Sequence, residues 1–289
     1  MAREAALLAQ KPQFLWPSSS VLVDLARSSG VKIARDQVIL NSPIVVYSWD
    51  RIAKGLVSAG FAQADGPARF RLDLAKLLDA VLQNKSWSSI GVSDLYGSAR
   101  LLSTNPNRSN SGFMFAGLAA NLLGGEVATL TSLGKVGSQV ETIFACMGYK
   151  PSSSGKMFED YLAGGPGAQP LVVGYENQLI EWVLEDAARW RRLDATAPAK
   201  PVILYPQPTV FSAHPLIAVD EKAEVLIEAL MTPRAQEIAW NIHGFRGPLG
   251  TSGELDNQLI GDRILPHIDS STPMPDFRTM LALIDRLAG

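Results

Sequence analysis

Cysteine is nearly absent from this chain, because Cys146 is the only one among 289 residues. A disulfide within the chain is therefore excluded. The compartment stays open, since large domains outside the cell can also fold without disulfides. Cys146 lies at the end of an apolar helical pattern at residues 136–147. A free cysteine usually packs as a small apolar side chain, so we expect Cys146 to be buried.

Dense charge and long apolar runs are also lacking. Lys and Arg number 26 against 28 Asp and Glu, the net charge is −2, and no segment forms a basic cluster, which excludes nucleic acid as a partner. The longest apolar run, residues 113–123, is about half of the roughly 20 residues that cross a bilayer. Residues 1–10 are too polar for a signal peptide. We therefore expect any export signal or membrane anchor to lie upstream of Met1.

Signatures of catalytic and cofactor sites are missing. The chain has no G-x-S-x-G elbow and no H-E-x-x-H zinc motif. Residues 148–156 resemble a phosphate loop, but six residues separate the glycines where four are needed, and Met157 replaces the Ser or Thr. The histidines are dispersed, at His214, His243 and His267. We predict no catalytic residue, metal or cofactor, although a pair of carboxylates that meets only in space stays an open alternative.

Apolar residues make up 47% of the chain, which is enough for a sizeable core. Their spacing alternates between two kinds of segment. Strands are expected at residues 38–47 (interrupted by Asn41-Ser42-Pro43), 98–103, 170–174, 201–205 and 216–219, and helices at residues 21–27, 51–56, 72–82, 113–123, 136–147, 178–192, 223–231, 234–242 and near the C-terminus. This alternation predicts an α/β fold in which mixed sheets are flanked by helices.

The most distinctive stretch joins a predicted strand to the apolar helix at residues 113–123. It contains Ser109, Asn110, Ser111 and Gly112. Backbone N–H groups and hydroxyls at a helix N-terminus face outward at the positive end of the helix dipole, which suits an anion or a polar ligand. The alternative is that these side chains only cap the helix.

Two further helix entrances carry similar groups. Ser18, Ser19 and Ser20 precede the helix at residues 21–27, and Tyr175 and Glu176 precede the helix at residues 178–192. If the three helix N-termini converge, they form a cleft for a small polar or anionic solute. Glu176 would repel an anion if it faced that cleft.

Several short motifs occur in a characteristic order. They are Trp16-Pro17-Ser18-Ser19-Ser20, Ser42-Pro43-Ile44-Val45-Val46, Asn105-Pro106-x-x-Ser109-x-Ser111-Gly112, Val173-Gly174-Tyr175-Glu176-Asn177, Tyr205-Pro206 and Thr232-Pro233-Arg234-Ala235-Gln236. In this order the chain resembles bacterial extracellular solute-binding proteins with the type 2 periplasmic-binding fold. The resemblance is closest to the branch with sulfate- and molybdate-binding proteins and the solute-binding domains found beside von Willebrand factor A domains.

The resemblance implies two α/β lobes, and it implies that Glu176, at the position of a family acidic residue, could anchor the hinge. Strand–helix units at residues 12–101 and 210–289 flank a middle of similar pattern, so we predict residues 1–101 and 210–289 in the first lobe and residues 102–209 in the second. The resemblance also implies a non-catalytic protein that holds its ligand at the three helix entrances named above. The implied partners are the membrane subunit of an ABC-type importer, a sensory protein or a von Willebrand factor A-domain protein. The implied location is periplasmic or extracellular, with membrane association through an upstream segment. Family members begin with a strand, a Ser-containing loop and a helix before the W-P-S-S-like segment, and this chain starts just short of that segment. A structural interaction module or an enzyme on the same fold is the alternative.

Overall fold

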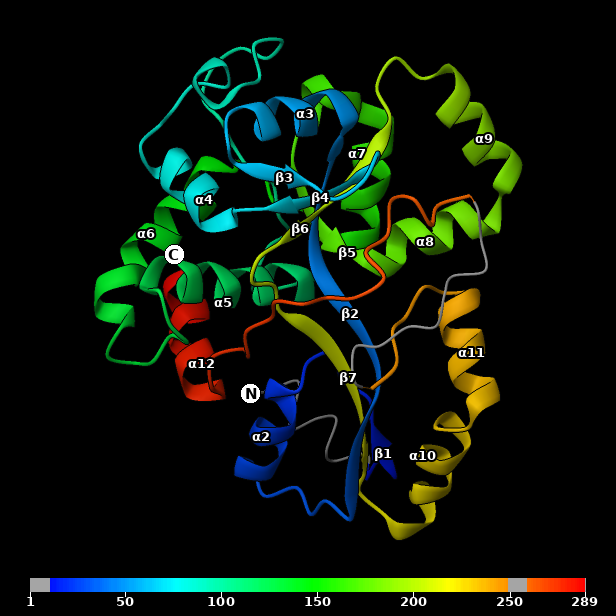
Figure 1. Ribbon diagram of the computed structural model, residues 1–289. Helices are drawn as coiled ribbons and strands as arrows, with labels where there is room; N and C mark the ends of the chain where they lie inside the picture. The colour runs from blue at the N-terminus through cyan, green and yellow to red at the C-terminus, as the bar shows by residue number, and fades with distance from the viewer. Residues whose placement is uncertain (1–10, 249–258, 289) are drawn as a thin grey trace.

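The computed structural model describes residues 11–248 and 259–288. One long strand, β2 (Arg35–Trp49), runs through the molecule (Figure 1). Its first half pairs with β7 (Phe211–Ala218), and its second half pairs with β5 (Val172–Tyr175) and β6 (Pro201–Pro206). The molecule therefore consists of two halves built on one strand. We call residues 44–210 the upper half, and residues 11–43 with 211–248 the lower half.

The upper half contains most of the secondary structure. Its sheet continues from β6 to β4 (Arg69–Leu72), which runs parallel to β6, and then to the antiparallel β3 (Ala62–Ala64). The helices of this half are α3 (Asp50–Ser58), α4 (Leu74–Leu82), α5 (Asn110–Gly124), α6 (Leu133–Cys146), α7 (Ser154–Ala168), α8 (Glu176–Glu185) and α9 (Ala187–Thr196). The central strands are buried on both faces, as expected for a sheet covered by helices on each side.

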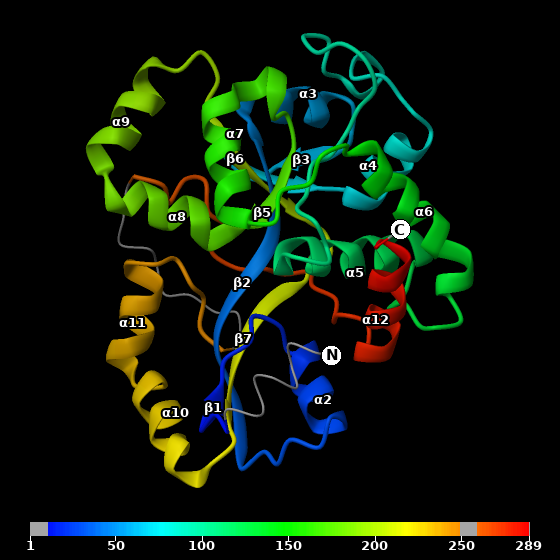
Figure 2. The same ribbon diagram turned by 180° about the vertical axis from the view of Figure 1, so that it is seen from behind.

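The lower half is smaller. Its sheet consists of β1 (Phe14–Leu15), β7 and the first half of β2. Figures 1 and 2 show α2 (Val21–Ser28) on one side of this sheet, and α10 (Glu224–Leu230) and α11 (Pro233–Asn241) on the other. The last helix, α12 (Phe277–Arg286), packs against α5 and α6 of the upper half and also contacts α2.

The two halves join where β2 and β7 pass each other. The Thr209 hydroxyl donates to the carbonyl of Ile44 at 2.6 Å. The Thr209 backbone N–H donates to Ser270 O at 3.2 Å, and its carbonyl accepts from Thr272 N at 2.8 Å. The chain therefore enters the upper half near Ile44 and leaves it near Thr209, with residues 270–272 bound to the second passage.

The strands that pair with each other do not all fall within the same predicted lobe, whose boundaries are at residues 102 and 210. Those boundaries place residues 44–101 with the lower half. In the structure β3 and β4, which come from that range, belong to the same sheet as β5 and β6. The passage near residue 209 agrees with the boundary at 210. As a division into independent domains, residues 1–101 with 210–289 and residues 102–209 stay a prediction.

The mixed α/β class is confirmed, but several local predictions are wrong. Cys146 is exposed, because it is the last residue of α6 and is not on the face that carries the helix's buried side chains. The helix predicted at residues 178–192 is two helices, since Asp186 has a non-helical φ of −146° and its carboxylate accepts from Arg189 N at 2.8 Å to begin α9. The strand predicted at residues 98–103 takes part only in isolated bridges, at Ser98 and Leu102. Among the described residues, no helix has the length and apolarity to span a membrane.

Candidate functional site

The N-terminus of α5 meets both halves through the side chain of Asn110. Its Nδ2 atom lies 2.9 Å from the Ser18 carbonyl oxygen and 3.3 Å from Ser212 Oγ, both in the lower half. The same atom lies 3.0 Å from the Tyr175 hydroxyl, in the upper half. The entrances of α2, α5 and α8 are thus in direct contact. We call Ser18, Asn110, Tyr175 and Ser212 the Asn110 cluster.

Hydroxyl groups continue from this cluster into the upper half. Ser111 is fully buried, and its Oγ lies 2.7 Å from Thr104 Oγ1 and 3.1 Å from Ser109 Oγ. Gly112 lies so close to the preceding loop that a Cβ atom there would be 2.4 Å from the Thr104 carbonyl oxygen. The loop can therefore fold back against the helix entrance only because residue 112 is glycine.

Tyr175 ends β5 and begins α8. Burial raises the pKa of its phenol, and hydrogen bonds from Asn110, Ser212 and Ser111 act in the opposite direction. Its backbone carbonyl accepts a hydrogen bond from the buried Tyr47 hydroxyl. Tyr175 is therefore a neutral phenol held rigidly at the seam between the halves.

The three serines before α2 have different surroundings. Ser18 contributes its backbone carbonyl to the Asn110 cluster. Ser19 is 1% exposed, and its hydroxyl has no hydrogen-bond partner among residues 11–248 and 259–288. Ser20 is exposed and lines a cavity of about 460 Å³ together with β7 and residues 271–277. Only Ser18 is thus brought directly into the cluster.

The hydrogen-bond partners of Glu176 lie outside the Asn110 cluster. Its carboxylate is fully buried and accepts from Arg246 Nε at 2.6 Å, from Arg246 Nη2 at 2.7 Å and from the Tyr205 hydroxyl at 2.6 Å. The Arg246 backbone in turn pairs with Asn41 in the first half of β2. This arrangement suits the anchoring role that the sequence left open, because the ion pair connects α8 in the upper half with the lower half.

The sequence analysis missed two residues of β7 that belong to this region. Ser212 is 1% exposed and donates to the Ser18 carbonyl at 2.8 Å. His214 lies on the same face of the strand, with its Nε2 atom 3.4 Å from Ser212 Oγ and its ring packed edge-on against Phe245. Burial lowers the pKa of His214 from its ordinary value of 6.5, so it is neutral at neutral pH. The polar, small, polar alternation of Ser212-Ala213-His214 is the signal that could have revealed a strand with a polar face.

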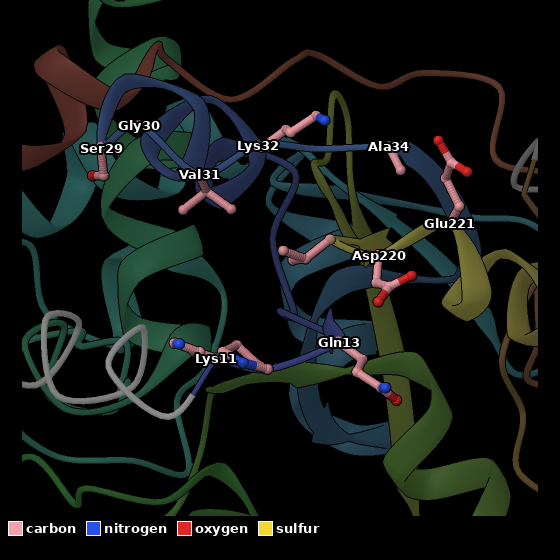
Figure 3. A pocket seen from close by; sticks show the side chains of 11 residues that line it. Lys11, Gln13, Ser29, Gly30, Val31, Lys32, Ala34, Asp220 and Glu221 are labelled. Carbon is pink, nitrogen blue, oxygen red and sulfur yellow. The ribbon is translucent and has the colours of Figure 1, made fainter.

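The cavity of about 460 Å³ beside Ser20 is not lined by a residue of the Asn110 cluster, and neither is a second cavity in the lower half. This second cavity, of about 630 Å³, lies at the far end of the lower half, bordered by Lys11, Lys32 and Asp220 (Figure 3). Within the described ranges, no group of three or more His, Cys, Asp or Glu side chains is arranged to hold a metal ion. The residues of the cluster are joined by direct hydrogen bonds across the seam between the halves.

Comparison with known proteins identifies structures that share the fold of this chain. No protein-family model matches the sequence, and no curated protein matches it. Among solved structures, the apo ferric ion-binding protein A of Pasteurella haemolytica is 13% identical with a TM-score of 0.60, over 96% of this chain and 81% of that one. A periplasmic thiamin-binding protein is 11% identical with a TM-score of 0.60, over 96% and 78% of the two chains. The substrate-binding protein of an ABC transporter from Agrobacterium tumefaciens is 14% identical with a TM-score of 0.56, over 96% and 78%.

These neighbours are two-lobed periplasmic binding proteins, so the predicted two-lobed α/β fold is confirmed. At such low identity the likeness establishes the fold alone. A fold hosts many functions, and the function has to be argued from the site.

Proposed function

We propose that this chain is a non-catalytic solute-binding protein that captures a small polar or anionic solute between its two halves. The observation that carries the proposal is the Asn110 amide, which bonds Ser18 and Ser212 on one side of the seam and Tyr175 on the other. A solute that enters the seam would meet carbonyl, hydroxyl and amide groups from both halves at once. Such convergent polar groups are what fix a small ligand in its site.

The partner and location follow from the same proposal. A soluble receptor of this fold serves the membrane subunit of an ABC-type importer, a sensory protein or a von Willebrand factor A-domain protein. The substrate-binding role of the Agrobacterium tumefaciens neighbour supports the first of these. The working place of the chain is then the periplasm or the cell exterior, with membrane association through an upstream segment. Fractionation of the full-length gene product tests this, and recovery from the cytosol alone would contradict it.

The resemblance to the sulfate- and molybdate-binding branch makes oxyanions the first solutes to test. Thermal melting of the protein with sulfate, molybdate and small metabolites should reveal a stabilising solute, because a ligand that binds only the folded state raises the melting temperature. Ser109→Ala should reduce that rise while costing little stability without ligand. Ser111→Ala should also reduce it, but it removes the partner of the buried Thr104 hydroxyl and should cost about 1–3 kcal/mol of stability without ligand.

The matched control is Ser153→Ala, which removes the cap of α7, where Ser153 Oγ accepts from Lys156 N at 3.4 Å. It should cost about 0.5–2 kcal/mol of stability and leave the solute response unchanged. The Ser109 side chain makes no capping hydrogen bond to α5. If Ser109→Ala and Ser111→Ala nevertheless leave the solute response unchanged, as this control should, the serines do not contact the solute and the proposed site is wrong. If no solute stabilises the protein, the receptor function itself fails and an interaction module becomes the better explanation.

A further inference from the structure

Asn110 connects the entrance of α5 directly to the lower half. Its Nδ2 atom lies 2.9 Å from the Ser18 carbonyl oxygen and 3.3 Å from Ser212 Oγ. The neighbouring Ser109 and Ser111 hydroxyls instead bond to each other within the upper half. A carbonyl oxygen can only accept, so the Asn110 amide is oriented with its nitrogen toward the lower half. The amide therefore holds the two halves together at this position.

The groups of the Asn110 cluster use one another as hydrogen-bond partners. The Ser212 hydroxyl donates to the Ser18 carbonyl at 2.8 Å, and the Tyr175 hydroxyl lies 3.0 Å from Asn110 Nδ2. The cavities of about 460 and 630 Å³ are lined by other residues. We call this conformation closed, because a solute could contact both halves at the cluster only after Asn110 had separated from Ser18 and Ser212.

Beside the cluster, the cavity of about 460 Å³ separates the lower half from the C-terminal segment. The lower half contributes Ser20 and Phe211 to its lining, and residues 271–277 form the opposite wall. Asn121 in α5 holds this wall to the upper half, because its Nδ2 donates to the Pro273 carbonyl at 2.9 Å. A rotation that moves α2 relative to this wall would therefore change the width of an existing cavity and would not open a packed core.

We propose that Asn110 is a latch that holds the ligand-free protein in the closed conformation. The inference rests on the proposed function and adds how the site is regulated, since a solute enters only an open conformation in which Asn110 has left Ser18 and Ser212. When only a fraction of the molecules is open, the apparent affinity for a solute is reduced by that fraction. The strength of the latch thus limits the affinity of the receptor.

The two conformations are close in free energy. Neutral hydrogen bonds such as those of Asn110 each contribute little, because bonds to water replace them on opening. The closed conformation also leaves the Ser19 hydroxyl, next to Ser18, 1% exposed and without a hydrogen-bond partner in the described part of the chain. An unpaired buried hydroxyl opposes closure, because its desolvation is not compensated. One side chain can therefore decide which conformation is populated.

Other contacts between the halves are compatible with such a motion. The ion pair of Glu176 with Arg246 lies at the strand passage, because the Arg246 backbone pairs with Asn41 of β2, so a rotation about the passage moves it little. His243 lies 2.6 Å from Glu181, but this pair is exposed, and exposed pairs contribute little. Loss of the Asn110 amide should therefore open the seam and leave the attachment of the halves intact.

The test measures the separation of the halves in the ligand-free protein. Spin labels are attached to Cys146, which is exposed in the upper half, and to Lys222→Cys, at an exposed position of the lower half. Double electron–electron resonance should give one main distance when Asn110 is present. Asn110→Ala should raise the ratio of open to closed molecules about 10-fold and populate a second distance, because two hydrogen bonds across the seam are lost. Asn107→Ala changes an exposed residue of the same loop and is the matched control, which should keep the single distance.

A second label pair distinguishes opening from unfolding. Cys146 and Lys85→Cys both lie in the upper half, so their distance should be the same with and without Asn110→Ala. If Asn110→Ala does not fold, Ser212→Ala takes its place, since it removes one acceptor in the lower half and should also populate the second distance. A single unchanged distance between Cys146 and Lys222→Cys overturns the latch, and so does an equal change in Asn107→Ala.

The outcomes also separate the latch from the proposed function. If Asn110→Ala opens the seam but no solute raises the melting temperature, the latch stands and the receptor function falls. If sulfate or molybdate stabilises the wild type while Asn110→Ala keeps the single distance, the receptor function stands and the latch falls.

Discussion

The two halves share β2 but differ in how they are stabilised. The upper half buries the second half of β2 completely, within a core that includes Tyr47, Leu78 and Tyr161. The lower half has a small separate core of Ile39, Leu216, Ala218, Ala223 and Ile227. Large apolar side chains are exposed in both halves, among them Trp16 at 43% and Val225 at 65% in the lower half and Leu130 at 55% in the upper half. Stability follows buried apolar area, so the lower half is the weaker unit and depends on its attachment to the upper one.

The largest effect is expected where the halves are attached. Arg246→Met leaves the Glu176 carboxylate buried without its cation, which should cost about 3–5 kcal/mol of unfolding free energy in urea titrations. Adding Glu176→Gln to Arg246→Met should recover part of the loss, since the uncompensated charge is then removed. The control is Arg286→Met, which breaks a surface pair with Glu141 and should cost about 0–1 kcal/mol. A loss as small as that of the control would show that the buried pair does not join the halves.

Matched core substitutions compare the halves directly. Leu78→Ala in the upper core and Ile227→Ala in the lower core each remove a fully buried side chain, at about 2–5 kcal/mol locally. Native-state hydrogen exchange should distinguish them. Ile227→Ala should speed exchange in residues 211–231 and leave β6 protected, whereas Leu78→Ala should speed exchange in both halves. Uniform acceleration by Ile227→Ala would mean that the halves unfold as one unit.

The smallest effect is a pH dependence confined to the lower half. The folded state lowers the pKa of His214 below 6.5, so between these two values the unfolded state binds more protons. Stability should therefore fall as the pH decreases through about 6.5 and stop falling below the folded pKa. The groups that face His214 are Ser212, with Tyr175 behind it, and the Phe245 ring. His214→Phe should flatten the melting temperature between pH 7 and pH 5, and the exposed His267→Phe should not. If the melting temperature of His214→Phe falls between pH 7 and pH 5 as steeply as that of the wild type, a group other than His214 causes the pH dependence.

The sequence predicted the helices and strands of the upper half better than it predicted which strands pair with each other. The amphipathic spacing of Leu74, Leu77, Leu78 and Val81 marks α4 because burial and helical period coincide there. Pro43 was expected to interrupt a strand, yet β2 runs through it. Pro43 lies where β2 passes from pairing with β7 to pairing with β5 and β6, so a missing N–H is tolerated there. Local propensity cannot reveal such a change of partner.

For the site, the sequence could identify polar helix entrances but not what each side chain faces. Ser109, Asn110 and Ser111 were predicted because turn residues precede an apolar helix, and of the three Asn110 contacts the lower half, whereas Ser109 and Ser111 bond to each other. The partner of Glu176 could not be found, because Arg246 follows the predicted helix at residues 234–242 in a loop and is 70 residues away. Ser212 and His214 were overlooked because β7 was predicted to begin only at residue 216, after the Pro215 that its strand in fact contains.

The pairing of β2 with β7 also determines the order in which the two halves can fold while the chain is being synthesised. Arg35 in β2 pairs with Ala218 in β7, so the lower half of β2 is made long before its partner leaves the ribosome. Residues 44–210 can meanwhile form their sheet, since each of their strand partners lies within that range. Until β7 is synthesised, residues 35–43 form an unpaired strand edge. Such edges are prone to aggregate and to bind chaperones. The seam that contains Ser18 and Ser212 is accordingly completed last, by a nascent chain whose upper half is already formed.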